Sequence, residues 1–148
     1  MKHPPEKCAK CGQRLRQRSD EEHNHYFAVL RSVYDNWPYS DKFHPESEEH
    51  LRHYLQMHAG HYRPVDVSAV GVSPDVIADQ VTALIQSLGV AHPFIEHRGE
   101  CIRIYVPLSV NKTDCKVKVF REVKAKVFDI IKARTGIDCE TVTGQEAA

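Results

Sequence analysis

The succession of hydrophobic patterns along the chain indicates its fold class before any motif is considered. Two helical patterns come first, a third stands between one strand-like run and a later pair of such runs, and a fourth lies near the end. This order cannot give repeated strand–helix–strand units, which build parallel sheets. The sequence therefore predicts an α+β fold, with about four helices packed on a small, mainly antiparallel sheet that contains a β-hairpin.

The bounds of these elements follow from capping residues and from apolar spacing. Ser19 and Glu22 form a capping box at the start of the first helix, and Pro38 stops that helix. A glycine follows each of the three later helices, as is common at helix C-termini. The expected helices span about residues 19–36, 46–59, 74–88 and 117–135, and the expected strands span residues 62–70, 93–97 and 101–106.

Charge is arranged in blocks, although 20 Lys and Arg residues balance 20 Asp and Glu residues. Residues 1–18 carry six basic side chains and one acid, residues 19–61 three basic and eight acidic, and residues 109–135 eight basic and three acidic. The neutral total excludes a uniformly basic nucleic-acid binder, but opposite blocks can face different partners. We expect a basic N-terminal segment over 1–18, one α+β domain over 19–140 and a flexible tail over 141–148.

A Cys-x-x-Cys knuckle in the basic segment is the sharpest local motif. Cys8 and Cys11, followed by a glycine, suit a tight turn that points two thiolates at one Zn²⁺, and His23 and His25 are candidates for the remaining ligands. Within a helix these two histidines lie about 200° apart, so both can bind one ion only if the helix starts later. His3 or Cys139 could substitute for one of them. The alternative is a short basic turn with two ordinary thiols.

Two groups of basic residues are candidates for nucleic-acid binding. Such side chains neutralise phosphates and give salt-dependent binding that tolerates different sequences. The first group alternates with uncharged residues, whereas the second lies beside acids and could be an ordinary solvated helix face. The candidate residues are Arg14, Arg16 and Arg18 in the N-terminal segment, and Lys118 and Arg121 on the last helix.

The second predicted helix is rich in histidine and supports a different functional hypothesis. His50, His53, His58 and His61 cluster on one side of a helical wheel, which would allow metal ligation or a pH-sensitive patch. The simpler interpretation is a half-exposed helix face. Phosphate-binding glycine loops, nucleophile elbows and paired acids of nuclease type are missing from the sequence. We therefore expect no catalysis, and keep a metal-dependent enzyme as a third hypothesis.

The sequence also indicates in which cellular compartment the protein is expected. Its longest nearly apolar stretch is interrupted by polar residues and falls short of the roughly 20 residues that a membrane span needs. The N-terminus shows no signal-peptide pattern. Five cysteines, an odd number, fit free thiols or metal ligands better than a disulfide framework. We expect a cytoplasmic protein.

Several strings across residues 8–140 resemble a family of small phage and prophage proteins of unassigned function. They are Cys8-x-x-Cys11-Gly12, Leu15-Arg16-x-Arg18-Ser19, Tyr26-Phe27, Trp37-Pro38, Glu48-Glu49-His50-Leu51-Arg52, Ala59-Gly60-His61-Tyr62-Arg63, Ser109, Phe120 and Thr135-Gly136-Ile137. The opening part is also distantly similar to the NinB recombination proteins of phages. The NinB resemblance implies an α+β fold, a dimer, and binding to single-stranded DNA or to the host protein that coats it.

These observations give one leading functional expectation and one alternative from another class. The first is a phage or prophage accessory protein in DNA recombination or replication, which binds single-stranded or branched DNA in a bacterial host cell without catalysis. The alternative is a protein-interaction module that inhibits or redirects a host DNA-transaction or defence protein. In that case the acids Glu46, Glu48 and Glu49 would form a surface that mimics nucleic acid.

Overall fold

The structure, a computed structural model, describes residues 20–90, 92–111 and 115–142 and confirms the α+β class. Its elements lie within a few residues of the expected bounds. The helices are α1 (Asp20–Asp35), α2 (Glu48–His58), α3 (Pro74–Ser87) and α4 (Val117–Thr135), the strands are β1 (Tyr62–Ser68), β2 (Phe94–Arg98) and β3 (Cys101–Pro107), and a short 3-10 turn, η1 (Cys139–Thr141), follows α4. None of these described helices is long and apolar enough to cross a membrane.

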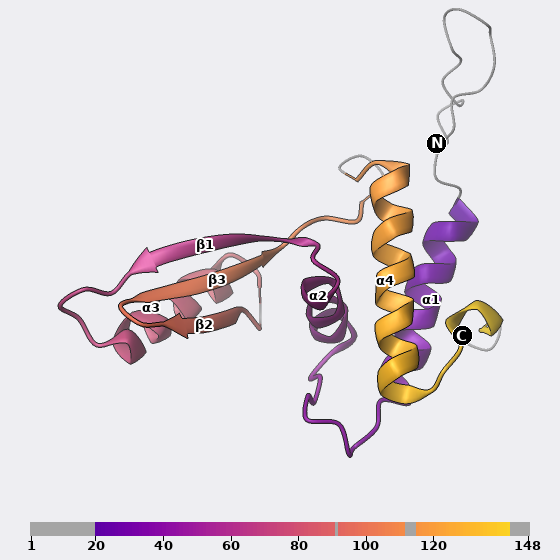
Figure 1. Cartoon of the computed structure of the whole chain (residues 1–148), viewed down its shortest axis with the longest axis horizontal. Coiled ribbons are helices and arrows are strands. Elements are labelled where there is room, and N and C mark those ends of the chain that lie inside the picture. Colours follow the sequence, from indigo (N-terminus) through magenta and orange to yellow (C-terminus); the bar gives the residue numbers. More distant parts are fainter. Residues whose placement is uncertain (1–19, 91, 112–114, 143–148) are drawn as a thin grey trace, which may run out of the picture.

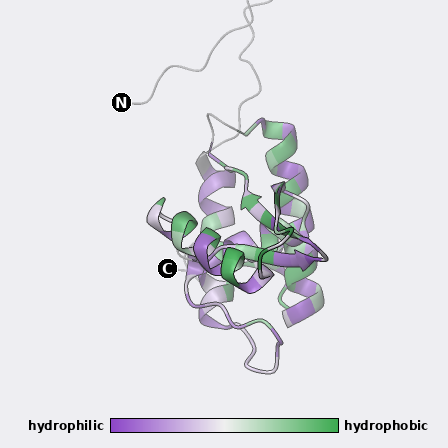
Figure 2. Cartoon of the chain, turned by 90° about the vertical axis from the view of Figure 1, so that its left-hand side faces the viewer, coloured by the Kyte–Doolittle hydropathy of each residue, from purple (hydrophilic) through white to green (hydrophobic). Residues whose placement is uncertain are grey.

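The elements form two parts rather than four helices stacked on one sheet. Helices α1, α2 and α4 pack together, whereas the sheet and α3 extend from them as an arm (Figure 1). The sheet is antiparallel with the order β1-β3-β2, and the expected hairpin is formed by β2 and β3. Figure 2 looks onto the free end of this arm and shows hydrophobic residues along α3.

One face of the arm's sheet is apolar, because side chains alternate along β3. Ile102 and Ile104 are buried, and Ile104 lies with Ile85 of α3 in one apolar groove. The intervening Arg103 points to the other face, where its guanidinium makes a bidentate ion pair with Asp66 of β1 at 2.8 and 3.0 Å. Helix α3 therefore covers the apolar face and leaves the polar face open.

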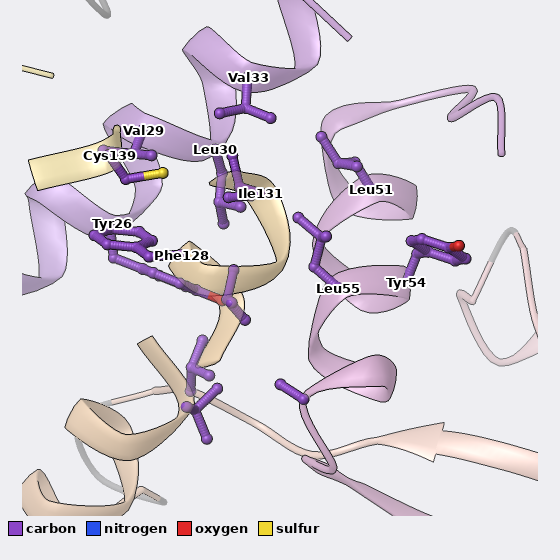
Figure 3. Packing of buried hydrophobic residues seen from close by; sticks show 14 of the residues in the cluster. Tyr26, Val29, Leu30, Val33, Leu51, Tyr54, Leu55, Phe128, Ile131 and Cys139 are labelled. Carbon is purple, nitrogen blue, oxygen red and sulfur yellow. The ribbon is translucent and has the colours of Figure 1, made fainter. Parts of the chain in front are cut away.

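The main core lies between the three packed helices (Figure 3). Their apolar residues recur at spacings of three and four, which places them on one face of each helix. The fully buried members are Tyr26, Val29, Leu30 and Val33 of α1, Leu51 and Leu55 of α2, and Phe120, Val127 and Ile131 of α4. Every fully apolar side chain among them would expose a hydrocarbon surface if the helices separated, so this core holds the described fold together.

Two boundaries differ from expectation for local reasons. Helix α2 begins at Glu48 rather than near residue 46, because the hydroxyl of Ser47 caps it by accepting from the His50 backbone N–H at 3.0 Å. The folded part continues to Val142, which packs on the core and whose carbonyl lies 2.9 Å from Nε2 of His25. The basic segment 1–18 and the rest of the predicted tail lie outside the described residues.

An ion pair joins the loop after α1 to the last turn of α4. The guanidinium of Arg134 donates to both carboxylate oxygens of Asp41, at 2.5 and 2.7 Å, and to the hydroxyl of Tyr54 at 3.0 Å. The side chain of Asp41 is only 8% exposed. The hydrogen bonds from Arg134 lower the pKa of Asp41 from 3.8 to about 2.

We expect Asp41→Asn to lower the free energy of unfolding by about 2 kcal/mol at neutral pH, because Arg134 loses its charged partner. Folding lowers the pKa of Asp41. The free energy of unfolding of the wild type should therefore exceed that of the variant above pH 4, and this difference should disappear as the pH falls from 3.8 towards 2. Urea unfolding at several pH values measures this difference. A gap between the two proteins that persists unchanged at pH 2 would contradict the assignment.

Candidate functional site

An open cleft of about 560 Å³ lies where α1, α2 and the segment after β3 meet. His23 and Phe27 contribute from α1, Arg52 and His53 from α2, and residues 107–111 form the remaining wall. None of the described residues that line this cleft is acidic. The cleft thus combines a guanidinium, two imidazoles and one aromatic ring.

Arg52 supplies the fixed positive charge of the cleft. Its guanidinium carbon lies 5.5 Å from the ring centroid of Phe27, a cation–π distance, and its Nη1 lies 3.5 Å from Oε1 of Gln56. The nearest described carboxylate that pairs with it is Glu49, at 4.0 Å and well exposed, which leaves the charge only weakly compensated. Arg52 is therefore oriented by its neighbours yet able to bind an anion.

Buried polar contacts hold the wall of the cleft in place. The side chain of Gln56 is fully buried and accepts from the Tyr26 hydroxyl at 3.2 Å, while its Nε2 donates to the Leu108 carbonyl at 3.2 Å. His61 adds a contact from Nε2 to the Ser109 carbonyl at 3.0 Å. Burial raises the pKa of Tyr26 above its usual range, so its hydroxyl remains a donor. These bonds fix residues 108 and 109 against α2.

The two histidines of the cleft have different surroundings. Burial, together with the neighbouring charge of Arg52, lowers the pKa of His53 to about 4. His53 is therefore neutral at pH 7. His23 lies against aromatic rings, with centroid distances of 4.7 Å to Phe27 and 6.3 Å to Phe120. Arg52 is the one permanently charged side chain among the described residues that line the cleft.

The predicted basic residues of α4 do not lie in this cleft's lining. Arg121 makes a bidentate ion pair with Glu22 of α1, at 2.7 and 3.2 Å, and these hydrogen bonds raise the pKa of Arg121. Its charge is thus largely compensated within the fold. Lys118 is exposed on the same helix. The other three predicted residues, Arg14, Arg16 and Arg18, lie outside the described residues.

The proposed zinc ligands can be followed only in part. His23 faces the cleft, whereas His25 contacts the Val142 carbonyl and stands edge-on to Phe128, so helical geometry separates the two as expected. Cys139 is buried, which raises its pKa to about 11 and disfavours the thiolate that a metal needs. Across the described ranges, no group of three or more His, Cys, Asp or Glu residues is placed to hold a metal ion. Zinc binding remains a prediction that depends on Cys8 and Cys11, outside those ranges.

The histidine-rich helix does not bring its four histidines to one point. His50 stacks on His92, with centroids 4.4 Å apart, and His53 enters the cleft. His58 lies against Tyr54 at 4.4 Å, and the buried His61 contacts the loop after β3. Their neighbours are mostly aromatic rings and backbone groups, which fits packing roles.

The predicted acidic surface is partly compensated by nearby groups. Glu48 lies 3.7 Å from Arg31, Glu46 lies 3.4 Å from His92, and Glu49 lies 3.8 Å from His53. The three carboxylates are exposed or half-exposed, and such pairs contribute little stability. Among the described residues, only Arg31 and Arg52 offset charge in this block, beside Glu48 and Glu49, because the neutral His53 cancels none of the charge of Glu49.

Sequence reasoning missed the cleft, although its residues stand in strings already singled out. Phe27, Arg52 and Ser109 belong to three separate strings of the phage resemblance, and the structure brings these strings together. In the sequence, Arg52 is one of three basic residues among the eight acids of residues 19–61, and nothing there marks it as a binding residue. A search of family models, of curated proteins and of solved structures finds no match to the chain.

Proposed function

We propose that this chain is a phage or prophage accessory protein that binds single-stranded or branched DNA without catalysis, with the Arg52 cleft holding the DNA backbone. The observation that supports this most is the guanidinium of Arg52, which lies on Phe27 in a cleft whose described lining contains no acid. Arginine presents several donors in a planar fork that matches phosphate oxygens. The cleft therefore suits an anionic backbone.

The position of the cleft supports a role for the basic N-terminal segment as well. His23 is only five residues after Arg18, so a fully extended chain could separate their Cα atoms by about 18 Å at most. We propose that Arg14, Arg16 and Arg18 contact phosphates next to those in the cleft. Lys118 could add a further contact, whereas Arg121 contributes less because Glu22 compensates its charge.

A single strand fits this surface better than a duplex for a geometric reason. Its phosphates and bases are both accessible, so a strand can enter a concave site that combines a basic group with an aromatic ring. Phe27 and the apolar side chains of Pro107 and Leu108 offer such a surface beside Arg52. Branched DNA contains similar unpaired segments at its junction.

We expect Arg52→Gln to weaken binding of labelled oligothymidylate by about tenfold and to reduce the salt slope by about one ion. Fluorescence anisotropy over a salt series measures both quantities. Arg31→Gln is the matched control, because Arg31 is exposed on α1 and pairs with Glu48 away from the cleft lining. No binding at low salt, or equal losses in both variants, would contradict the proposal.

The alternative proposal, an acidic module that inhibits or redirects a host protein, has less support. It requires Glu46, Glu48 and Glu49 to act together as a negative surface, but Glu48 lies 3.7 Å from Arg31 and Glu49 lies 4.0 Å from Arg52. A pull-down with host DNA-transaction proteins would favour it only if substituting these three acids removed the interaction while DNA binding stayed unchanged.

A further inference from the structure

Helix α3 carries an exposed apolar ridge. All of its residues are described, and none is fully buried although one side lies along the sheet. Val76, Gln80, Leu84 and Leu88 recur every four residues, so they form one ridge that continues just past the helix end. Val76 is 49% exposed, Leu84 61% and Leu88 76%. Gln80 is the one polar member of this ridge, and exposed apolar side chains gathered on one helix face are typical of an interaction site.

An apolar groove adjoins one end of this ridge. It has a volume of about 170 Å³ and lies between the C-terminal end of α3 and the sheet, with Leu88 at its border. Its lining includes Ile85, Val90, Ile104 and Val106. This side of the arm therefore has an apolar ridge that projects and an apolar groove beside it. Two copies of one surface can pack together when it has both.

We infer that the α3 ridge is a dimer interface that packs against α3 of a second copy of this chain. The charges of the helix favour this occupant over nucleic acid. Asp75 and Asp79 are the only charged residues of α3, and both lie in its N-terminal half. A surface with two acids and no base repels phosphates, whereas its uncharged C-terminal half accepts another apolar helix.

Asp75 and Asp79 also determine how the two α3 helices are oriented in the proposed dimer. Parallel helices would bring the four carboxylates together, which like-charge repulsion disfavours. An antiparallel pair centred between Gln80 and Leu84 places Val76 opposite Leu88 of the second copy. Each copy's Asp75 and Asp79 then lie beside the uncharged half of the other helix. This arrangement is the two-fold contact common in homodimers.

The size of the surface indicates a modest affinity. Helix α3 has 14 residues and is therefore about 21 Å long. Val70 and Val72, in the loop that precedes it, are 65% and 48% exposed and extend its apolar surface. Standard interfaces bury about 800 Å² on each subunit, and a contact made by one helix of this length and a short flank is small by that measure. We expect a dissociation constant on the order of micromolar.

Sedimentation velocity of the full chain over a wide concentration range tests this interface. We expect reversible dimerisation of the wild type, and Leu84→Glu should raise the dissociation constant roughly 30-fold or more. Val119→Glu is the matched control, because Val119 is an exposed apolar residue of α4, outside the arm. Since Leu84 is largely exposed, its substitution should leave the circular dichroism spectrum and the melting temperature nearly unchanged.

An experiment with oppositely charged variants of Leu84 tests whether the dimer forms through α3 or through another surface. Leu84 lies within about one helical turn of its own symmetry mate in the antiparallel pair, so Leu84→Glu and Leu84→Lys should each be monomeric and form a heterodimer when mixed. A monomeric wild type would overturn the inference and leave the ridge to a different protein. Dimers that survive Leu84→Glu, or mixed variants that stay monomeric, would overturn it as well. None of these outcomes depends on DNA binding.

Discussion

Phe120→Ala should lower the free energy of unfolding by about 4 kcal/mol, the largest stability effect that we expect from one substitution. Phe120 is fully buried, and its ring meets that of Tyr26 nearly at a right angle with centroids 5.5 Å apart. Truncation removes this contact between α4 and α1 and leaves a cavity that rigid helices cannot fill. Urea denaturation followed by the fluorescence of Trp37, the single tryptophan, measures the loss.

The neighbouring residue provides the control for this experiment. Val119 is 39% exposed on the same turn of α4, so Val119→Ala should change the free energy of unfolding by well under 1 kcal/mol. Both variants reduce an apolar side chain to alanine within one helix. Similar decreases in the free energy of unfolding of the two variants would contradict the packing of Phe120 between α4 and α1.

Gln56→Leu should lower the free energy of unfolding by about 3 kcal/mol although it replaces a polar core residue with an apolar one. The change leaves the Tyr26 hydroxyl and the Leu108 carbonyl without the partner that each has in the wild type. It also removes the bond that holds the Leu108 carbonyl beside the cleft, so we expect DNA affinity to fall together with stability. Urea denaturation and fluorescence anisotropy give the two values.

A double-mutant cycle with Tyr26→Phe isolates the buried contact. Tyr26→Phe removes only the hydroxyl, and it should be destabilising in the wild type but nearly neutral when Leu replaces Gln56. The coupling measures the hydrogen bond between the two side chains, which the structure places at 3.2 Å. Additive effects of the two substitutions would show that Tyr26 and Gln56 do not interact.

The elements of the fold could be predicted because their ends are determined by local sequence. Gly136 follows α4 with a φ of 77°, a left-handed conformation that glycine adopts without strain, and Gly99 has a φ of 59° in the hairpin turn. The predicted end of β1 was two residues too late. Beyond Ser68 the backbone turns, with the Val72 N–H bonded to the Ala69 carbonyl at 3.1 Å, and apolar alternation does not register such a turn.

The candidate site could not be predicted because distant segments build it. Gln56 and Leu108 are 52 residues apart, and the pair of Glu22 and Arg121 spans 99 residues. Helical wheels place Arg121 correctly on an exposed side of α4, but they carry no information about which helix lies beside it. Sequence patterns therefore located basic residues but missed Arg52, which the fold places in a cleft whose described lining contains no acid.

The chain enters and leaves the arm of sheet and α3 at adjacent points. Tyr62 and Pro107, the first residue of β1 and the last of β3, are paired in the sheet, and the Leu108 N–H bonds to the His61 carbonyl at 3.4 Å. The two helices on either side are thus already joined at one point. Ile102 and Ile104 do not belong to the core cluster of the three helices. The arm is thus a segment whose two ends meet beside the helical part, and Phe94 of β2 packs it against the core there.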